Sequence, residues 1–102
     1  MPIDTEMIRE ALRSVVDPEL QLNIVDLGLI YAIEQPADGE VAITMTLTTP
    51  GCPIGSTLVQ AVERTLALIP GVQRVEVHLT FDPPWSPERI TPAGRAHLGW
   101  AT

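Results

Sequence analysis

Cys52 is the only cysteine of the 102-residue chain, and it lies in the segment Thr48 to Gly55, which reads TTPGCPIG. A strand-like pattern runs into this segment and a helix-like pattern runs out of it, so the thiol is expected where a helix begins. Unpaired N–H groups and the positive dipole end of a helix favour an anion there. Such a setting lowers the pKa of a cysteine and keeps thiolate available. A small residue tolerated in a turn is the alternative interpretation, and the sequence leaves both open.

Other chemistries find little support in the sequence. A zinc site needs about four ligands, and one cysteine with the distant His78 and His97 is a poor match. A cysteine nucleophile usually needs a histidine base, and neither histidine is expected near Cys52. The chain has no CxxC pair and no GxxxxGK or GxGxxG phosphate loop. We therefore predict that the protein is not an enzyme and has no catalytic residues.

Composition narrows the class of protein further. The net charge is -7, from 6 basic and 13 acidic residues, and no basic stripe is present, so we expect no nucleic-acid partner. No stretch approaches the roughly 20 apolar residues of a membrane span, and no signal-peptide pattern opens the chain. A single cysteine fits a reducing compartment, so the expected location is the cytoplasm. The length fits one domain over residues 1–102.

Hydrophobic periodicity predicts five main elements and a short tail. Asp4 or Thr5 can cap a first helix, which should end at Asp17 because Pro18 disfavours helical geometry before it. The remaining expected elements are strands over 29–34, 41–48 and 75–81, a helix over 58–69, and short helical turns after Ser86 and Thr91. The core should span about residues 5–85, with 86–102 as a C-terminal helical tail.

The element order α-β-β-α-β predicts an α/β (α+β) fold, a two-layer sandwich with a mixed three-stranded sheet. The first two strands should form an antiparallel hairpin, and the helix between the second and third makes that pair parallel. Both amphipathic helices should cover one sheet face. The other face is expected to be polar and partly open, and its residues are Thr44, Thr46, Glu76, His78 and Thr80.

These strand directions bring distant residues to one edge of the sheet. The second strand ends at the cysteine segment, the parallel third strand ends before Pro83-Pro84-Trp85, and the antiparallel first strand begins after Asp26. We therefore expect Asp26, Cys52 and Trp85 to cluster at strand ends, where ligand sites in α/β proteins are common.

Four motifs in order resemble a known family. They are Asp17-Pro18-Glu19, the run Asn23 to Ile30 (NIVDLGLI), Thr48 to Pro53 (TTPGCP) and Pro83-Pro84-Trp85. Together they resemble the metal–sulfur cluster biosynthetic factors, the small PaaD/SufT-like, MIP-eighteen-type proteins. The resemblance spans about residues 8–85. The chain departs from some relatives, because it has neither their zinc-binding cysteine tail nor their fused ATPase.

The resemblance implies a fold like iron–sulfur scaffold domains and a transiently bound cofactor, either an iron–sulfur cluster or iron. It implies Cys52 and Asp26 as cofactor-binding residues, with Cys52 as a transient metal ligand. Thr49, Pro53 and Trp85 match as loop-shaping residues.

The resulting hypothesis is a cytoplasmic iron–sulfur cluster assembly or delivery factor acting through a single thiolate. A cluster generally needs four protein ligands, so it would be shared across a homodimer or with a client or assembly protein. The alternative is a docking subunit for an oxygenase or a P-loop ATPase that binds no metal itself.

Overall fold

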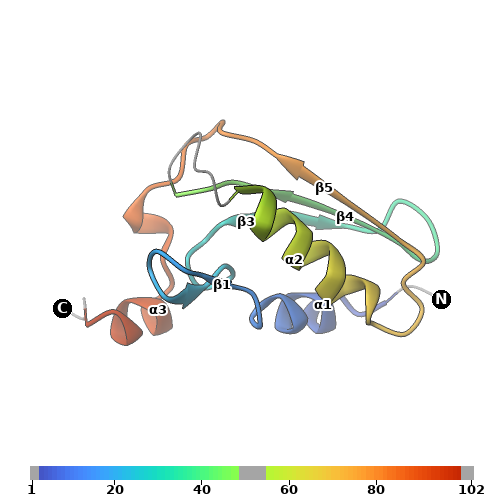
Figure 1. The fold of residues 1–102 in the computed structure, drawn as a ribbon, viewed down its shortest axis with the longest axis horizontal. Helices are drawn as coiled ribbons and strands as arrows, with labels where there is room; N and C mark the ends of the chain where they lie inside the picture. The colour runs from blue at the N-terminus through green and yellow to red at the C-terminus, as the bar shows by residue number, and fades with distance from the viewer. Residues whose placement is uncertain (1–2, 49–54, 100–102) are drawn as a thin grey trace.

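The computed structural model describes residues 3–48 and 55–99, and Figure 1 shows the arrangement of their elements. In chain order these are α1 (Thr5–Leu12), β1 (Val16–Asp17), β2 (Leu22–Asn23), β3 (Ile30–Glu34), β4 (Glu40–Met45), α2 (Gly55–Ala67), β5 (Arg74–Leu79), the 3-10 helix η1 (Pro87–Arg89) and α3 (Pro92–His97).

The main sheet has the strand order β3-β4-β5 and is mixed, as predicted. Strands β3 and β4 are antiparallel, with Ile33 opposite Ile43, and β4 and β5 are parallel, with Ile43 opposite Val77. Helix α2 makes the crossover that the parallel pair requires. This topology places the start of β3 and the ends of β4 and β5 at one edge of the sheet.

Helices α1 and α2 lie on the same side of this sheet, so the expected two-layer sandwich is confirmed (Figure 1). Along β4, alternate side chains point into the core, and Val41, Ile43 and Met45 are fully buried or nearly so. Fully burying an aliphatic side chain of this kind stabilises the fold by roughly 1.5–3 kcal/mol. The helices contribute the matching apolar residues, which are Ile8, Leu12, Leu58, Val62 and Leu66.

Helix α1 begins as predicted and ends earlier than predicted. Its N-cap is Asp4, whose Oδ1 accepts a hydrogen bond from the N–H of Glu6 at 2.9 Å. The prediction that it reaches Asp17 is wrong, because the helix ends at Leu12. The next N–H groups bond three residues back, from Arg13 to Glu10 and from Val15 to Leu12, which tightens the last turn. The chain then becomes extended and enters β1.

The connection expected between the first helix and the first strand contains a small sheet that periodicity did not reveal. Strands β1 and β2 pair antiparallel over two residues each, with Val16 opposite Asn23. Asp17 is buried, and its Oδ1 accepts the N–H of Glu19 at 2.8 Å. This side-chain turn gives one carboxylate oxygen a local partner, so the Asp-Pro-Glu motif here closes a turn.

The expected polar sheet face is correct for most of its residues and wrong for one. Thr44, Glu76 and Thr80 are partly exposed and His78 is exposed. Thr46, in contrast, is fully buried, and no described residue offers its hydroxyl a hydrogen bond. The strand alternation stops at Met45, and the N–H of Thr46 donates to the carbonyl of Leu29 beyond the strand. The strands are accordingly shorter than predicted, with β4 ending at Met45 and β5 at Leu79.

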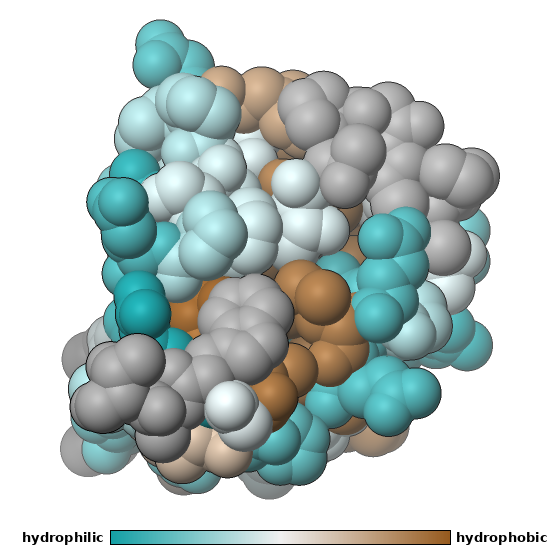
Figure 2. All heavy atoms as spheres, turned by 90° about the vertical axis from the view of Figure 1, so that its left-hand side faces the viewer, coloured by the Kyte–Doolittle hydropathy of each residue, from teal (hydrophilic) through white to brown (hydrophobic). Residues whose placement is uncertain are grey.

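The C-terminal segment folds back against the body of the protein. Ser86 and Thr91 are N-caps with proline at the first helical turn, as their spacing predicted. Ile90, beyond the expected core limit at residue 85, is buried and belongs to the core. Figure 2 views the end of the molecule that carries α3 and shows a hydrophobic area in the middle of hydrophilic side chains. None of the helices in the described segments is long and apolar enough to cross a bilayer.

Candidate functional site

The sequence predicted a site from residues on three loops, and the structure describes part of it. Cys52, Thr49 and Pro53 lie outside the described residues. Asp26 and Trp85 are both described, and both lie at the edge of the sheet where β3 begins. The geometry of this edge can therefore be built from Asp26, Trp85 and their contacts.

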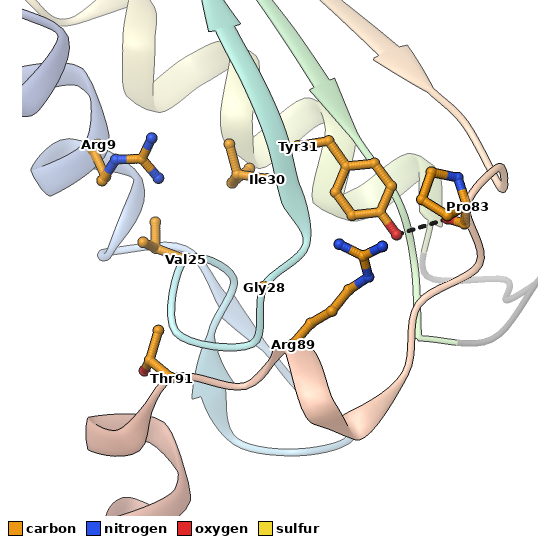
Figure 3. Close-up of a pocket in the computed structure, with 8 residues that line it drawn as sticks. All are labelled: Arg9, Val25, Gly28, Ile30, Tyr31, Pro83, Arg89 and Thr91. Atoms are coloured by element: carbon orange, nitrogen blue, oxygen red, sulfur yellow. Dashed lines mark hydrogen bonds between the residues drawn. The ribbon is translucent and has the colours of Figure 1, made fainter.

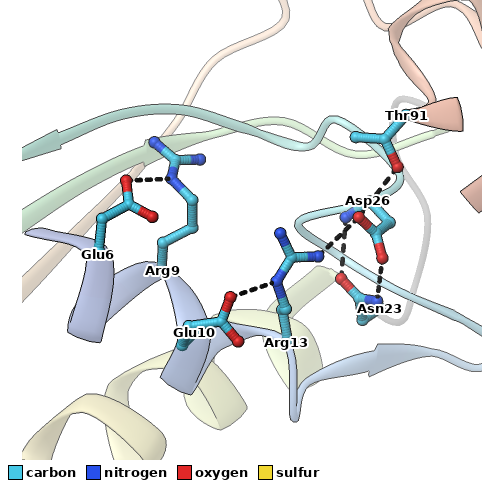
Figure 4. A network of polar contacts seen from close by, with 7 residues as sticks. All are labelled: Glu6, Arg9, Glu10, Arg13, Asn23, Asp26 and Thr91. Carbon is cyan, nitrogen blue, oxygen red and sulfur yellow. Dashed lines mark hydrogen bonds and ion pairs between the residues drawn. The ribbon is translucent and has the colours of Figure 1, made fainter. Parts of the chain in front are cut away.

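Asp26 is held by three side chains from separate parts of the chain (Figure 4). Its Oδ1 accepts from Arg13 Nη1 at 2.7 Å and from the Thr91 hydroxyl at 2.9 Å. Its Oδ2 accepts from Asn23 Nδ2 at 2.8 Å, and its own N–H donates to Asn23 Oδ1 at 2.8 Å. The carboxylate is mostly buried, with 13% of the side chain exposed. Every oxygen of Asp26 is therefore engaged in fixing α1, the 23–26 turn and the C-terminal segment together.

The pKa of Asp26 reflects this arrangement. Burial raises the pKa, but the hydrogen bonds from Asn23, Arg13 and Thr91 together with the charge of Arg13 outweigh it, so the pKa lies below its ordinary value. The hydrogen bond to Asp26 correspondingly raises the pKa of Arg13. Asp26 is thus held as a carboxylate, and a metal ion would have to displace existing partners to bind it.

Trp85 is fixed to the residue that follows Asp26. Its indole Nε1 donates to the main-chain carbonyl of Leu27 at 2.6 Å, and its ring packs against the core while partly exposed. Neighbouring Pro83 accepts a hydrogen bond from the Tyr31 hydroxyl at 2.8 Å. The structure therefore brings Asp26 and the Pro83-Pro84-Trp85 turn to one edge, as strand direction predicted, and Trp85 is bonded to Leu27 there and packs against the core.

Gly28 lets the C-terminal segment approach this edge closely. It has a φ of 80°, and a Cβ added there would overlap the main-chain oxygen and the side chain of Arg89. The N–H of Thr91 also donates to the carbonyl of Asp26 at 2.9 Å. A residue with a side chain at position 28 would strain the backbone and push this segment away.

Sequence reasoning missed the partners of Asp26. Arg13 and Asn23 carried no motif of their own, and Thr91 was singled out only as a helix cap. Thr91 serves both roles, because its hydroxyl oxygen also accepts from the N–H of Gly94 at 3.0 Å. A buried aspartate needs hydrogen-bond partners, and this requirement is the one signal that could have pointed to them. Which residues serve as partners depends on the fold.

The described residues contain no group of three or more histidine, cysteine, aspartate or glutamate side chains that could hold a metal ion. His78 lies 3.5 Å from Glu76, and His97 lies 3.2 Å from the carbonyl of Gln21, so the two histidines are on separate surfaces. Cys52, in a segment the structure leaves undescribed, is the one thiol that this chain can offer a metal.

Comparison with known proteins defines the class of protein that has this fold. The model of the family described as "Iron-sulfur cluster assembly protein" matches residues 5–79. The chain is 44% identical over 94 residues to the Fe-S protein maturation auxiliary factor YitW of Bacillus subtilis (strain 168), covering 92% of each chain. It is 39% identical over 85 residues to the Fe-S protein maturation auxiliary factor SufT of Staphylococcus aureus (strain USA300), covering 83% of this chain and 97% of that relative. This protein belongs to the iron–sulfur cluster assembly protein family, which confirms the resemblance found in its motifs.

Solved structures support the same assignment of fold. A domain of unknown function (DUF59) from Bacillus anthracis superposes with a TM-score of 0.87 at 37% identity, covering 92% of this chain and 90% of that one. A conserved hypothetical protein from Thermotoga maritima gives a TM-score of 0.81 at 43% identity, covering 95% of each chain. The mixed three-stranded sheet with helices on one face is therefore shared with structures of recognisable sequence similarity.

Proposed function

We propose that this protein is a non-enzymatic factor in the assembly or delivery of iron–sulfur clusters, acting in the cytoplasm through the thiolate of Cys52. The observation that carries the proposal is the family match over residues 5–79, together with relatives of nearly equal length named as Fe-S protein maturation auxiliary factors. More distant relatives are named iron-sulfur cluster carrier proteins, and the chain covers 23% of the length of one from Synechocystis.

The number of cysteine ligands in one chain determines how the protein would bind a cluster. One chain has one cysteine, whereas a cluster generally needs four protein ligands. The cluster would therefore be bound transiently, as cargo, and shared with a second copy or with a client or assembly protein. Thiolate is the soft ligand that iron–sulfur chemistry uses, so Cys52 is the residue on which transfer depends.

In this proposal Asp26 acts by positioning and not as a ligand. Its oxygens already accept from Arg13, Asn23 and Thr91, and a metal ion bound there would displace these hydrogen bonds, which are mostly shielded from water. Trp85 and Gly28 support the same edge from the C-terminal segment. Thr49 and Pro53 are proposed to shape the segment that carries Cys52.

Anaerobic reconstitution with iron and sulfide, followed by visible absorption, tests the proposal. The wild-type protein should gain a cluster spectrum and Cys52→Ser should not. Asp26→Asn keeps the thiol and is expected to retain part of the signal, and Glu10→Gln is the matched surface control. A Cys52→Ser protein that takes up the same amount of iron as wild type would overturn the thiolate role and favour a docking subunit for an oxygenase or P-loop ATPase.

A further inference from the structure

A pocket of about 540 Å³ opens between α1, the start of β3 and the C-terminal segment (Figure 3). Its volume is in the range of small-ligand sites. Its lining includes the side chains of Arg9, Val25, Ile30, Tyr31, Pro83 and Arg89. Among the described residues that line the pocket, none is acidic.

The charge of the pocket contrasts with the charge of the protein. The net charge of the chain is -7, and all six of its basic residues are arginines. Two of the six, Arg9 from α1 and Arg89 from η1, line this pocket, and Figure 3 shows them entering it from different sides. A positive pocket on an acidic protein selects anions by local charge.

The two guanidinium groups retain free hydrogen-bonding capacity. Arg89 stands 4.7 Å from the centroid of the Tyr31 ring, and no acidic side chain among the described residues pairs with it. Arg9 lies 4.0 Å from Glu6, whose side chain is 76% exposed, and an exposed pair of this kind is weak. A guanidinium carries five donors in a planar fork, so both arginines can receive an incoming anion.

The two hydroxyl groups of the pocket and two of its main-chain N–H groups are already used. The N–H of Gly28 donates to Val25, and the N–H and hydroxyl of Thr91 both donate to Asp26. The Tyr31 hydroxyl donates to the carbonyl of Pro83, which also fixes the ring beneath Arg89. Phosphate sites usually rely on free backbone N–H groups, and this pocket offers guanidinium forks between apolar walls instead.

We propose that this pocket binds a ligand with two carboxylates on a short carbon frame, one carboxylate for Arg9 and one for Arg89. The guanidinium fork matches a carboxylate in a bidentate fashion. Val25, Ile30 and the ring of Pro83 provide apolar surface for the carbon frame. The dicarboxylate can be a free organic acid or a pair of acidic side chains on a partner protein, and the experiment below distinguishes these sources.

The test is a titration of the full-length ¹⁵N-labelled protein at constant ionic strength, followed through the arginine Nε–Hε signals. The probes are succinate, a tri-glutamate peptide and inorganic phosphate. We expect saturable shifts of the Arg9 and Arg89 signals with succinate, with the peptide or with both, while Arg64 and Arg74 report general charge screening. Binding of succinate alone identifies a free acid as the source, and binding of the peptide alone identifies a partner's acidic side chains.

Variants assign the binding to the pocket. Arg9→Gln and Arg89→Gln should each weaken binding at least about tenfold, and Arg89→Lys, which keeps the charge and loses the fork, should be intermediate. Arg64→Gln is the matched control and should bind as wild type. Thermal melting without ligand verifies that each variant is folded. Unsaturable shifts, equal movement of all arginine signals, or tighter binding of phosphate than of either carboxylate probe would overturn the proposal. Neither iron nor Cys52 enters this experiment, so its result is independent of the proposed cluster function.

Discussion

The Thr91 hydroxyl donates a hydrogen bond to Asp26 Oδ1 at 2.9 Å, and the Thr91 N–H donates to the Asp26 carbonyl at 2.9 Å. These two contacts join residues 65 positions apart and attach the C-terminal segment to the edge of the sheet. Arg13 reaches the same carboxylate oxygen from the end of α1. Asp26 is therefore the point at which three separate segments meet.

Replacing Asp26 with asparagine should destabilise the protein by about 1–3 kcal/mol, because it removes a charged partner from hydrogen bonds that are mostly shielded from water. Urea unfolding at neutral pH measures the change. The matched control is Glu10→Gln, which removes an exposed ion pair with the same Arg13 and should cost less than about 1 kcal/mol. A loss for Asp26→Asn below about 1 kcal/mol, as expected for the control, would show that the Asp26 network contributes little.

The contribution of Asp26 should also depend on pH. Its folded-state pKa lies below its ordinary value of about 3.9, so the ionised form is favoured in the folded protein. The resulting stability is present above the unfolded-state pKa and is lost as the pH falls through the lower folded-state pKa. The difference in unfolding free energy between wild type and Asp26→Asn should therefore narrow as the pH drops below about 4. A difference that stays constant down to acidic pH would contradict this assignment.

Two glycines with similar backbone angles separate strain from steric overlap. Gly28 has a φ of 80° and Gly99 a φ of 76°, but a Cβ at Gly28 meets Arg89, whereas a Cβ at Gly99 meets nothing within 4 Å. Gly99→Ala should cost about 1–2 kcal/mol of unfolding free energy from backbone strain alone. Gly28→Ala should cost about 1–3 kcal/mol more, because the overlap with Arg89 displaces the C-terminal segment. Thermal or urea unfolding of the two variants measures the difference. Equal losses of unfolding free energy would mean that the C-terminal segment moves away from position 28 without an energetic penalty.

Thr46 allows a stabilising substitution. Its hydroxyl is fully buried without a hydrogen-bond partner among the described residues, and such a group costs about 1–3 kcal/mol. Thr46→Val removes the hydroxyl and keeps the shape, so the midpoint of urea unfolding should rise. The partly exposed Thr44 is the control, and Thr44→Val should change stability by less than about 0.5 kcal/mol. A loss of stability in Thr46→Val would mean that its hydroxyl has a partner in solution.

Cys52→Ser tests the proposed function in cells. Serine keeps nearly the same volume, so the folded protein should accumulate normally, but a hydroxyl cannot replace a thiolate as a soft ligand for iron. In a strain that lacks the protein, the variant should fail to restore the activity of iron–sulfur enzymes while their polypeptide levels change less. Full restoration by Cys52→Ser would show that the thiol is dispensable.

The sequence by itself determined the order of the main helices and strands, the topology of the three-stranded sheet and the family. The alternation along Val41 to Leu47 is a local property of the chain, and strand direction followed from the lengths of the connections. The same reasoning placed Asp26 and the Pro83-Pro84-Trp85 turn at one edge. The position of Cys52 at that edge stays a prediction.

Only the tertiary structure decided how that edge is built. Helix α1 ends at Leu12 because the following residues pair in a small sheet, which is a non-local interaction that the helical spacing does not encode. Thr46 is buried because the strand alternation ends at Met45. The hydrogen-bond partners of Asp26 come from residues 13, 23 and 91. Arg9 and Arg89, far apart in the sequence, line the same pocket. Contacts of this kind depend on how elements pack in three dimensions, whereas periodicity reports only which face of each element is apolar.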